Sequence, residues 1–121
     1  MKIKNVNVDV YSWKVDIIEM SNQDTFEDAE KALKKYKLGN EIISTIKKEM
    51  NDKCKDGGYT FTQFGKWRSV IFLYRMSSQK RRRNVLNHEK RHVEDDILQH
   101  LGINDKEAAA YLAGYLSSYI Y

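Results

Sequence analysis

The chain has 121 residues, a net charge of +4, and 41% hydrophobic and 31% charged residues. This length and composition are typical of one soluble globular domain over residues 1–121 that buries a core without disulfide bonds. No apolar run has the length of a signal peptide or of the roughly 20 residues that span a membrane. We therefore expect neither a membrane protein nor a disulfide-stapled secreted domain.

Cysteine usage and the basic residues give weaker indications. Cys54 is the one cysteine and has no partner for a disulfide or for a Cys-based metal site. A lone cysteine favours a reducing compartment, so we expect a cytoplasmic protein. Positive charge gathers in Lys80-Arg81-Arg82-Arg83, which permits contact with nucleic acid, although such charges more often solvate helix faces.

The sequence predicts strands and helices in an α+β order. In chain order we expect a strand over residues 6–10, and a second strand over 13–19 or a continuation of the first after a kink near Ser12. Helices over 25–37 and from 40 to about 50, a turn over 55–58, and strands over 59–63 and 69–74 follow. A helix from 77 or 78 to about 101 and a last helix from about 105 complete the chain. Val6, Val8 and Val10 alternate with polar residues, as in a strand. Gly65 predicts a hairpin between the two later strands, and Gly102 a helix end. Strands and helices grouped in this way indicate an α+β fold.

The long helix carries the motif His88-Glu89-Lys90-Arg91-His92. Its two histidines are separated by about 40° of rotation and about 6 Å of rise, so both imidazoles can reach one zinc ion. Glu89 lies about 100° round from His88. At that angle it is poorly placed to ligate the ion but can take a proton from a water bound to it. The alternative is a solvated helix face with two incidental histidines.

A catalytic zinc site needs a third protein ligand. His100 is a poor candidate because it lies about 12 Å along the helix from His92 and about 80° round from it. A polar residue in the last helical turn is the simpler interpretation of His100. Asp95 and Asp96 lie about 4.5 and 6 Å beyond His92 and are better placed to orient an imidazole.

The best third ligand is Glu107, in the first turn of the last helix. A short connection returns this helix towards the histidines. An alternative is a capping box over residues 104–107, with Glu107 at its third position. Small residues near Glu107 favour the ligand role because they let another helix approach closely: Ala108, Ala109, Ala110, Ala113 and Gly114.

The histidine motif followed by Glu107 and the run Ala110-Tyr111-Leu112-Ala113-Gly114-Tyr115 resembles the compact zincin-like proteins of phages and mobile elements in gut bacteria. More broadly it resembles the gluzincins, whose third ligand is a glutamate on the following helix. The resemblance implies a small zincin-like domain, in which a mixed sheet with a β-hairpin edge packs on the metal-bearing helix and the C-terminal helix. It also implies Zn²⁺ as cofactor, His88, His92 and Glu107 as ligands, and Glu89 as general base.

This resemblance implies zinc-dependent hydrolysis of a peptide bond. Zincins commonly hold an extended peptide along an edge strand, and we expect Ser69–Leu73 to be that strand. The alternative is that Ser69–Leu73 is a plain core strand. Tyr111 and Tyr115 are candidates for stabilising an oxyanion, although packing residues are the simpler interpretation.

Two other functions compete with a peptidase. The first is a non-catalytic module of a phage or mobile element, in which zinc staples the last two helices; the charged pair Lys90-Arg91 stands where active peptidases commonly have uncharged residues. The second is a nucleic-acid binder that uses the basic residues, with aromatic side chains for stacking. The stacking candidates are Tyr59, Phe61 and Trp67.

Overall fold

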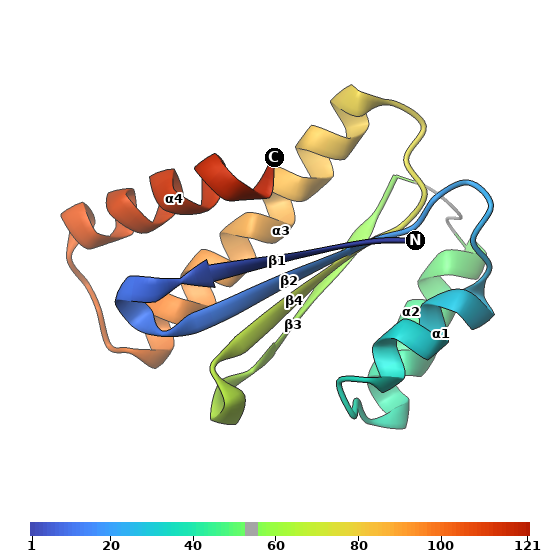
Figure 1. Ribbon diagram of the computed structural model, residues 1–121, viewed down its shortest axis with the longest axis horizontal. Helices are drawn as coiled ribbons and strands as arrows, with labels where there is room; N and C mark the ends of the chain where they lie inside the picture. The colour runs from blue at the N-terminus through green and yellow to red at the C-terminus, as the bar shows by residue number, and fades with distance from the viewer. Residues whose placement is uncertain (53–55) are drawn as a thin grey trace.

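The computed structural model describes the backbone of residues 1–52 and 56–121, and the side chains of residues 1–49 and 56–121. Its centre is a four-stranded sheet in the order β1-β2-β4-β3 (Figure 1). The strands are β1 (Lys2–Val8), β2 (Trp13–Glu19), β3 (Gly58–Gln63) and β4 (Arg68–Leu73). β1 pairs antiparallel with β2 and β3 antiparallel with β4, whereas β2 and β4 are parallel. The predicted α+β class with a mixed sheet is therefore confirmed.

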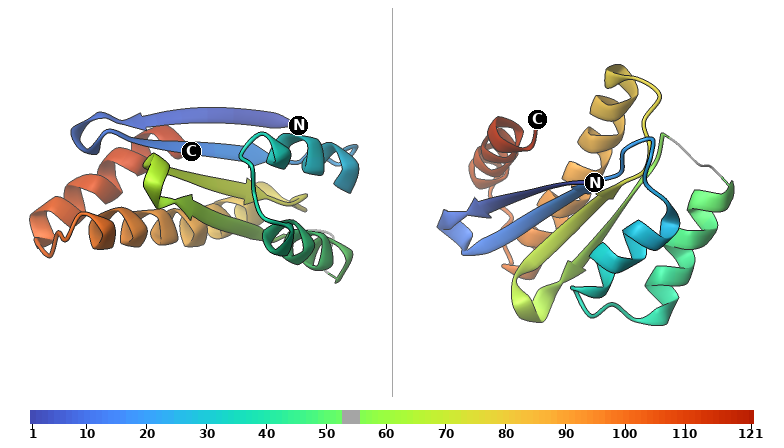
Figure 2. Two further views of the ribbon diagram at one scale, coloured as in Figure 1. Left: turned by 90° about the horizontal axis from the view of Figure 1, so that it is seen from below. Right: turned by 45° about the vertical axis from the view of Figure 1, so that its right-hand side comes forward.

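Four helices cover the two faces of this sheet (Figures 1 and 2). They are α1 (Phe26–Lys34), α2 (Asn40–Asp52), α3 (Gln79–His100) and α4 (Lys106–Ile120). α1 and α2 pack on one face, and α3 and α4 pack on the other. Across the described segments, no helix combines the length and apolar composition that a membrane crossing requires.

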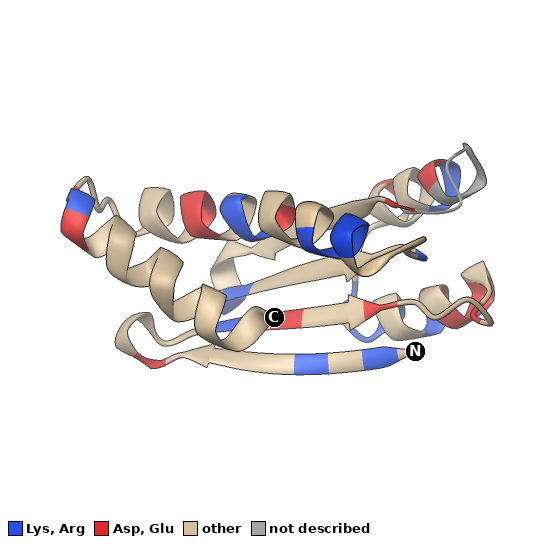
Figure 3. Ribbon diagram, turned by 90° about the horizontal axis from the view of Figure 1, so that it is seen from above, with Lys and Arg blue, Asp and Glu red and all other residues tan. Residues whose placement is uncertain are grey.

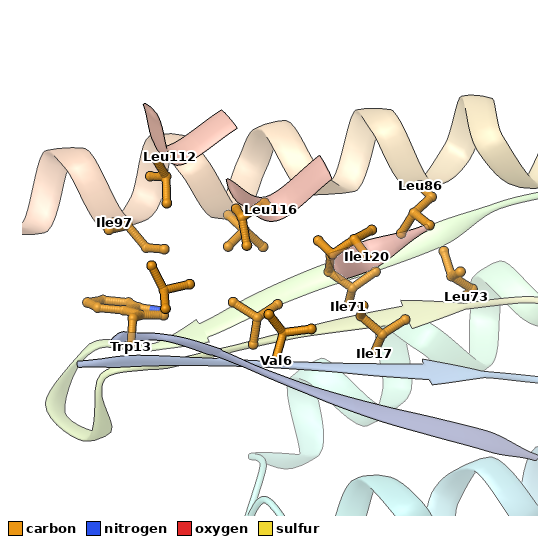
Figure 4. Close-up of a cluster of buried hydrophobic side chains, with 13 residues drawn as sticks. Val6, Trp13, Ile17, Ile71, Leu73, Leu86, Ile97, Leu112, Leu116 and Ile120 are labelled. Carbon is orange, nitrogen blue, oxygen red and sulfur yellow. The ribbon is translucent and has the colours of Figure 1, made fainter. Parts of the chain in front are cut away.

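The core beneath α3 and α4 holds in place the helix that carries His88, Glu89 and His92. Ile17 of β2 and Ile71 of β4 lie against Leu86, Leu116 and other apolar side chains of the two helices (Figure 4). Burying several such side chains, at about 1.5–3 kcal/mol each, is the main contribution that orients α3 on the sheet. The face of α3 opposite this core is left to solvent, and the histidines lie there.

Strand β4 lies in the interior of the sheet, so the expectation that Ser69–Leu73 is an edge strand is wrong. β4 pairs with β2 on one side and with β3 on the other. Its residues from Ser69 to Leu73 are all buried because helices cover both faces of this strand, which is typical of an interior strand. The two edges of the sheet are β1 and β3.

Some predicted element ends also differ. Val10 lies in the 3₁₀ turn Asp9–Tyr11 and not in a strand, and its side chain is 62% exposed. α1 ends at Lys34 and not at Lys37, which has a left-handed φ of 54°. The predicted cap of α3 is confirmed at Ser78, whose hydroxyl accepts the Arg81 amide. Cys54 and Lys55 lie outside the described residues. The predictions that depend on them, a cysteine without a disulfide partner and part of the turn over residues 55–58, therefore stay predictions.

Candidate metal centre

His88 and His92 turn their Nε2 atoms toward each other on the exposed face of α3. These two atoms are 3.1 Å apart, and the rings are perpendicular with centroids 4.7 Å apart. Two imidazoles bound to one tetrahedral zinc ion at about 2.0–2.1 Å would have their nitrogens about 3.3 Å apart. The close approach is favourable if one nitrogen is protonated and the other is not, or if both lone pairs point at one cation. The pair therefore fits two ligands of a zinc ion.

Glu89 points from the same turn of α3 toward the edge strand β3. Its side chain is buried, and the Thr60 hydroxyl donates a hydrogen bond of 2.5 Å to Glu89 Oε2. The pKa of the Tyr74 hydroxyl is raised, mainly by burial and next by its hydrogen bond to Glu49. The charge of Glu89 adds to this effect. The carboxylate is therefore held in one direction by a neutral donor.

Gly58 allows α3 to lie this close to β3. A Cβ atom at Gly58 would be 3.1 Å from Glu89 Cγ, from Val85 Cγ1 and from the Phe72 carbonyl oxygen. Because the carbonyl belongs to a paired strand and cannot give way, we expect Gly58→Ala to lower the free energy of unfolding by about 1–3 kcal/mol. Urea denaturation followed by circular dichroism measures this change.

The matched control for that substitution is Gly114→Ala on α4. No atom lies within 4 Å of a Cβ at Gly114, and alanine is a better helix former than glycine by about 1 kcal/mol. Gly114→Ala should therefore be neutral or stabilising. If Gly58→Ala is equally harmless, α3 does not pack against β3 as described.

A second carboxylate on α3 is fixed in the same way. Thr62, two residues beyond Thr60 on the same face of β3, donates a hydrogen bond of 2.6 Å to Asp96 Oδ2. Behind Thr62, its Oγ1 lies 2.9 Å from Ser69 Oγ, which accepts the indole N–H of the buried Trp13 at 3.0 Å. α3 is thus tied to the edge strand by one threonine–carboxylate pair on each side of His92.

An open cavity of about 380 Å³ lies between α3 and β3. Its lining consists of Gly58, Tyr59, Thr60, Glu89, His92 and Asp96. A larger cavity of about 570 Å³ lies near Lys2, Glu19 and Arg82, and no histidine lines it. The cavity beside His92 therefore joins a histidine of the pair, the buried Glu89 and the edge strand β3.

Glu107 does not join the histidine pair in this structure. α4 packs beside β1 and α3, whereas Glu89 and His92 line a cavity at β3, the opposite edge of the sheet. α3 also continues past His92 to His100, about 12 Å farther along the helix, before α4 begins. Among residues 1–49 and 56–121, no three His, Cys, Asp or Glu side chains gather as one metal-binding group.

The cap at the start of α4 differs from the predicted capping box. Asp105 is the N-cap residue, and its carboxylate accepts the backbone N–H of Glu107 at 2.9 Å. Glu107 is therefore the second residue of the helix and is exposed. It adds negative charge to the first turn, where the helix dipole favours it.

The remaining candidates lie away from the histidine pair. His100 packs against the rings of Trp13, Phe64 and Trp67 at the end of α3. Tyr111 is half exposed and stacks on Tyr115, whose hydroxyl donates to the Asn7 carbonyl of β1 at 2.7 Å. Both tyrosines thus lie on the side of β1 and not beside the cavity.

The residues proposed for nucleic-acid binding are dispersed. The basic residues 80–83 open α3, and short acidic and basic blocks follow one another along the rest of the helix (Figure 3). The guanidinium of Arg82 makes two hydrogen bonds to Glu19, and the ammonium of Lys90 contacts Glu94. Phe61 is buried, and Trp67, which is 41% exposed, packs edge-on against His100. Two of the basic residues are thus engaged in ion pairs, and one of the stacking candidates is buried.

Sequence reasoning missed Thr60 and Thr62. The sequence does contain an indication of them, because the alternation Thr60-Phe61-Thr62 places two hydroxyls on one face of a strand. Their partners on α3 are distant in sequence, and only the fold identifies them. Comparison with known proteins gives no match to a protein-family model, a curated sequence or a solved structure.

Proposed function

We propose that this protein binds one zinc ion between His88 and His92 and hydrolyses peptide bonds. The observation that carries the proposal is the convergence of the two Nε2 atoms to 3.1 Å on an exposed helix face. A zinc ion there would lower the pKa of a water molecule and polarise a substrate carbonyl. The fold agrees in its coarse features, since a hairpin-edged mixed sheet packs on the helix that bears the motif.

Glu89 is the proposed general base. It lines the same cavity as His92 and is held by the Thr60 hydroxyl, so it needs little reorganisation to act. It accepts the proton of the attacking water and then passes that proton to the leaving amine. His88 and His92 would hold the ion as neutral imidazoles, because a protonated imidazole has no lone pair for a metal.

The proposed substrate is an extended peptide that adds to the free edge of β3. This replaces the earlier assignment to Ser69–Leu73, because β4 has no free edge. β3 carries no charged residue from Gly58 to Gln63, whereas the opposite edge strand begins with Lys2 and Lys4. Lysines on an edge discourage pairing with another strand. Of the two edges, β3 therefore suits strand addition better, and it borders the cavity.

Glu107 is the proposed third ligand, on the strength of the sequence resemblance. To reach the pair, the first turn of α4 would have to move around the connection over residues 101–105, which includes Gly102 with its φ of 68°. We expect Glu107→Ala to lower zinc affinity at least about tenfold, as loss of one ligand should. Zinc affinity is measured by competition with a chromogenic chelator.

Asp105→Ala is the control for that experiment. It removes the cap of α4 and should cost about 1 kcal/mol of stability without changing zinc affinity. Unchanged zinc affinity in Glu107→Ala would show that another group completes the site, and the assignment to the gluzincin type would be lost.

The proposed activity is tested with the full chain purified without added metal or chelator. Metal analysis should find close to one zinc per chain, and a diverse library of extended peptides should contain substrates whose cleavage stops when a chelator is added. Protein that carries no zinc and takes none up at micromolar concentrations contradicts the metal site. Zinc-loaded protein that cleaves no peptide contradicts the enzyme and leaves the non-catalytic zinc module.

A further inference from the structure

We infer that the cavity beside His92 selects peptides with a lysine or arginine side chain, which Asp96 binds. The inference rests on the proposed addition of a peptide to β3, but it requires neither zinc nor turnover. The carboxylates of α3 form ion pairs on one side of the helix and not on the other.

Two of the four carboxylates on α3 have cationic partners. Glu94 contacts the Lys90 ammonium at 2.7 Å, and Asp95 lies 3.7 Å from the Arg91 guanidinium. Both are pairs at i,i+4 spacing, the usual arrangement on a helix surface. These pairs neutralise the part of the helix that turns away from β3.

The other two carboxylates, Glu89 and Asp96, face β3 and have hydroxyl donors instead. Their partners are Thr60 and Thr62, and neither carboxylate takes part in an ion pair among the described residues. Both line the cavity, whose six lining residues include no lysine or arginine. A protein with a net charge of +4 thus has an acidic cavity beside its free strand edge.

Asp96 can accept a further donor. An ionised carboxylate has about four acceptor positions, and the Thr62 hydroxyl occupies one of them. Asp96 is half-buried, so a cation that reached it would be partly shielded from water. It lies four residues beyond His92, and the Thr62 hydroxyl holds its carboxylate on the side of β3.

The geometry of strand addition points a peptide side chain at this carboxylate. Side chains of a strand alternate between its two faces, and Thr60 and Thr62 mark the face of β3 that turns toward α3. Alternate side chains of a peptide paired with β3 lie on that same face. A long cationic side chain among them can reach into the cavity, whereas an acidic one meets like charge.

The test measures binding and not cleavage. The probes are fluorescent eight-residue peptides of alternating valine and threonine with one central lysine, or with norleucine in its place. The full chain as purified should bind the lysine peptide about fivefold more tightly or better, as a partly shielded ion pair allows. Fluorescence anisotropy gives both dissociation constants, and mass spectrometry shows whether the peptides stay intact.

Two matched variants test whether Asp96 causes the preference for the lysine peptide. Asp96→Asn keeps an oxygen that accepts from Thr62, so it should fold and should lose the preference for lysine. Asp95→Asn removes an equal charge one residue away, on an exposed part of the helix, and should keep the preference. Equal binding of both peptides by the wild type, failure to bind either at millimolar concentration, or an unchanged preference in Asp96→Asn overturns the inference. Missing zinc or missing cleavage would leave these outcomes unaffected and would count against the proposed function alone.

Discussion

Replacement of either His88 or His92 by alanine should abolish zinc binding. The two Nε2 atoms lie 3.1 Å apart, and one imidazole alone would provide too few ligands to hold zinc at micromolar concentration. Both side chains are exposed on α3, and alanine favours helix, so the fold should be retained. Metal analysis after dialysis measures zinc content, and circular dichroism checks the helix content.

His100→Ala is the control for the histidine variants. His100 lies on the same helix but packs against Trp13, Phe64 and Trp67. Its loss should reduce stability modestly and leave one zinc per chain. A His88→Ala variant that retains full zinc affinity would refute the metal site, because His88 would then not be a ligand.

Glu89→Gln should reduce peptide hydrolysis at least about hundredfold, the usual scale for loss of a general base. Glutamine keeps the shape and an oxygen that can accept from the Thr60 hydroxyl, so packing between α3 and β3 should persist. Zinc content should also persist, since both histidines remain. The measurement is kcat/KM with a peptide that the wild type cleaves.

Asp95→Asn is the control for that variant, because it removes one carboxylate from the same helix at an exposed position. It should cleave at the wild-type rate. Activity that survives Glu89→Gln would remove this residue from the proposed mechanism, and an inactive wild type with bound zinc would favour the structural role of the metal.

The elements of the fold were largely predictable because their signals are local. The Ser78 cap, the glycine after α3 and the apolar stripes of the helices each depend on residues close together in sequence. The order of the strands was not predictable in this way. It depends on pairs such as Val15 and Ser69, which lie in parallel strands joined by two helices and a hairpin strand. The edge was therefore assigned to the wrong strand of the hairpin.

The candidate site shows the same limit. His88, Glu89 and His92 share one helix, so the helical repeat alone predicts which of them converge. Their surroundings come from another element: Thr60 fixes the Glu89 carboxylate from β3, and Thr62 fixes Asp96. The sequence placed Asp96 near the histidines but could not show that its partner is a threonine and not a cation.

The hydrogen-bond chain from Trp13 to Asp96 can run in one direction only. The Trp13 indole can only donate, and each hydroxyl of Ser69 and Thr62 has a single proton. Ser69 therefore donates to Thr62, and Thr62 donates to Asp96, so all the bond dipoles point the same way and reinforce one another. A change of charge at the surface carboxylate alters the polarisation of every bond behind it. We therefore expect the NMR signal of the buried Trp13 indole N–H to shift if a cation binds at Asp96.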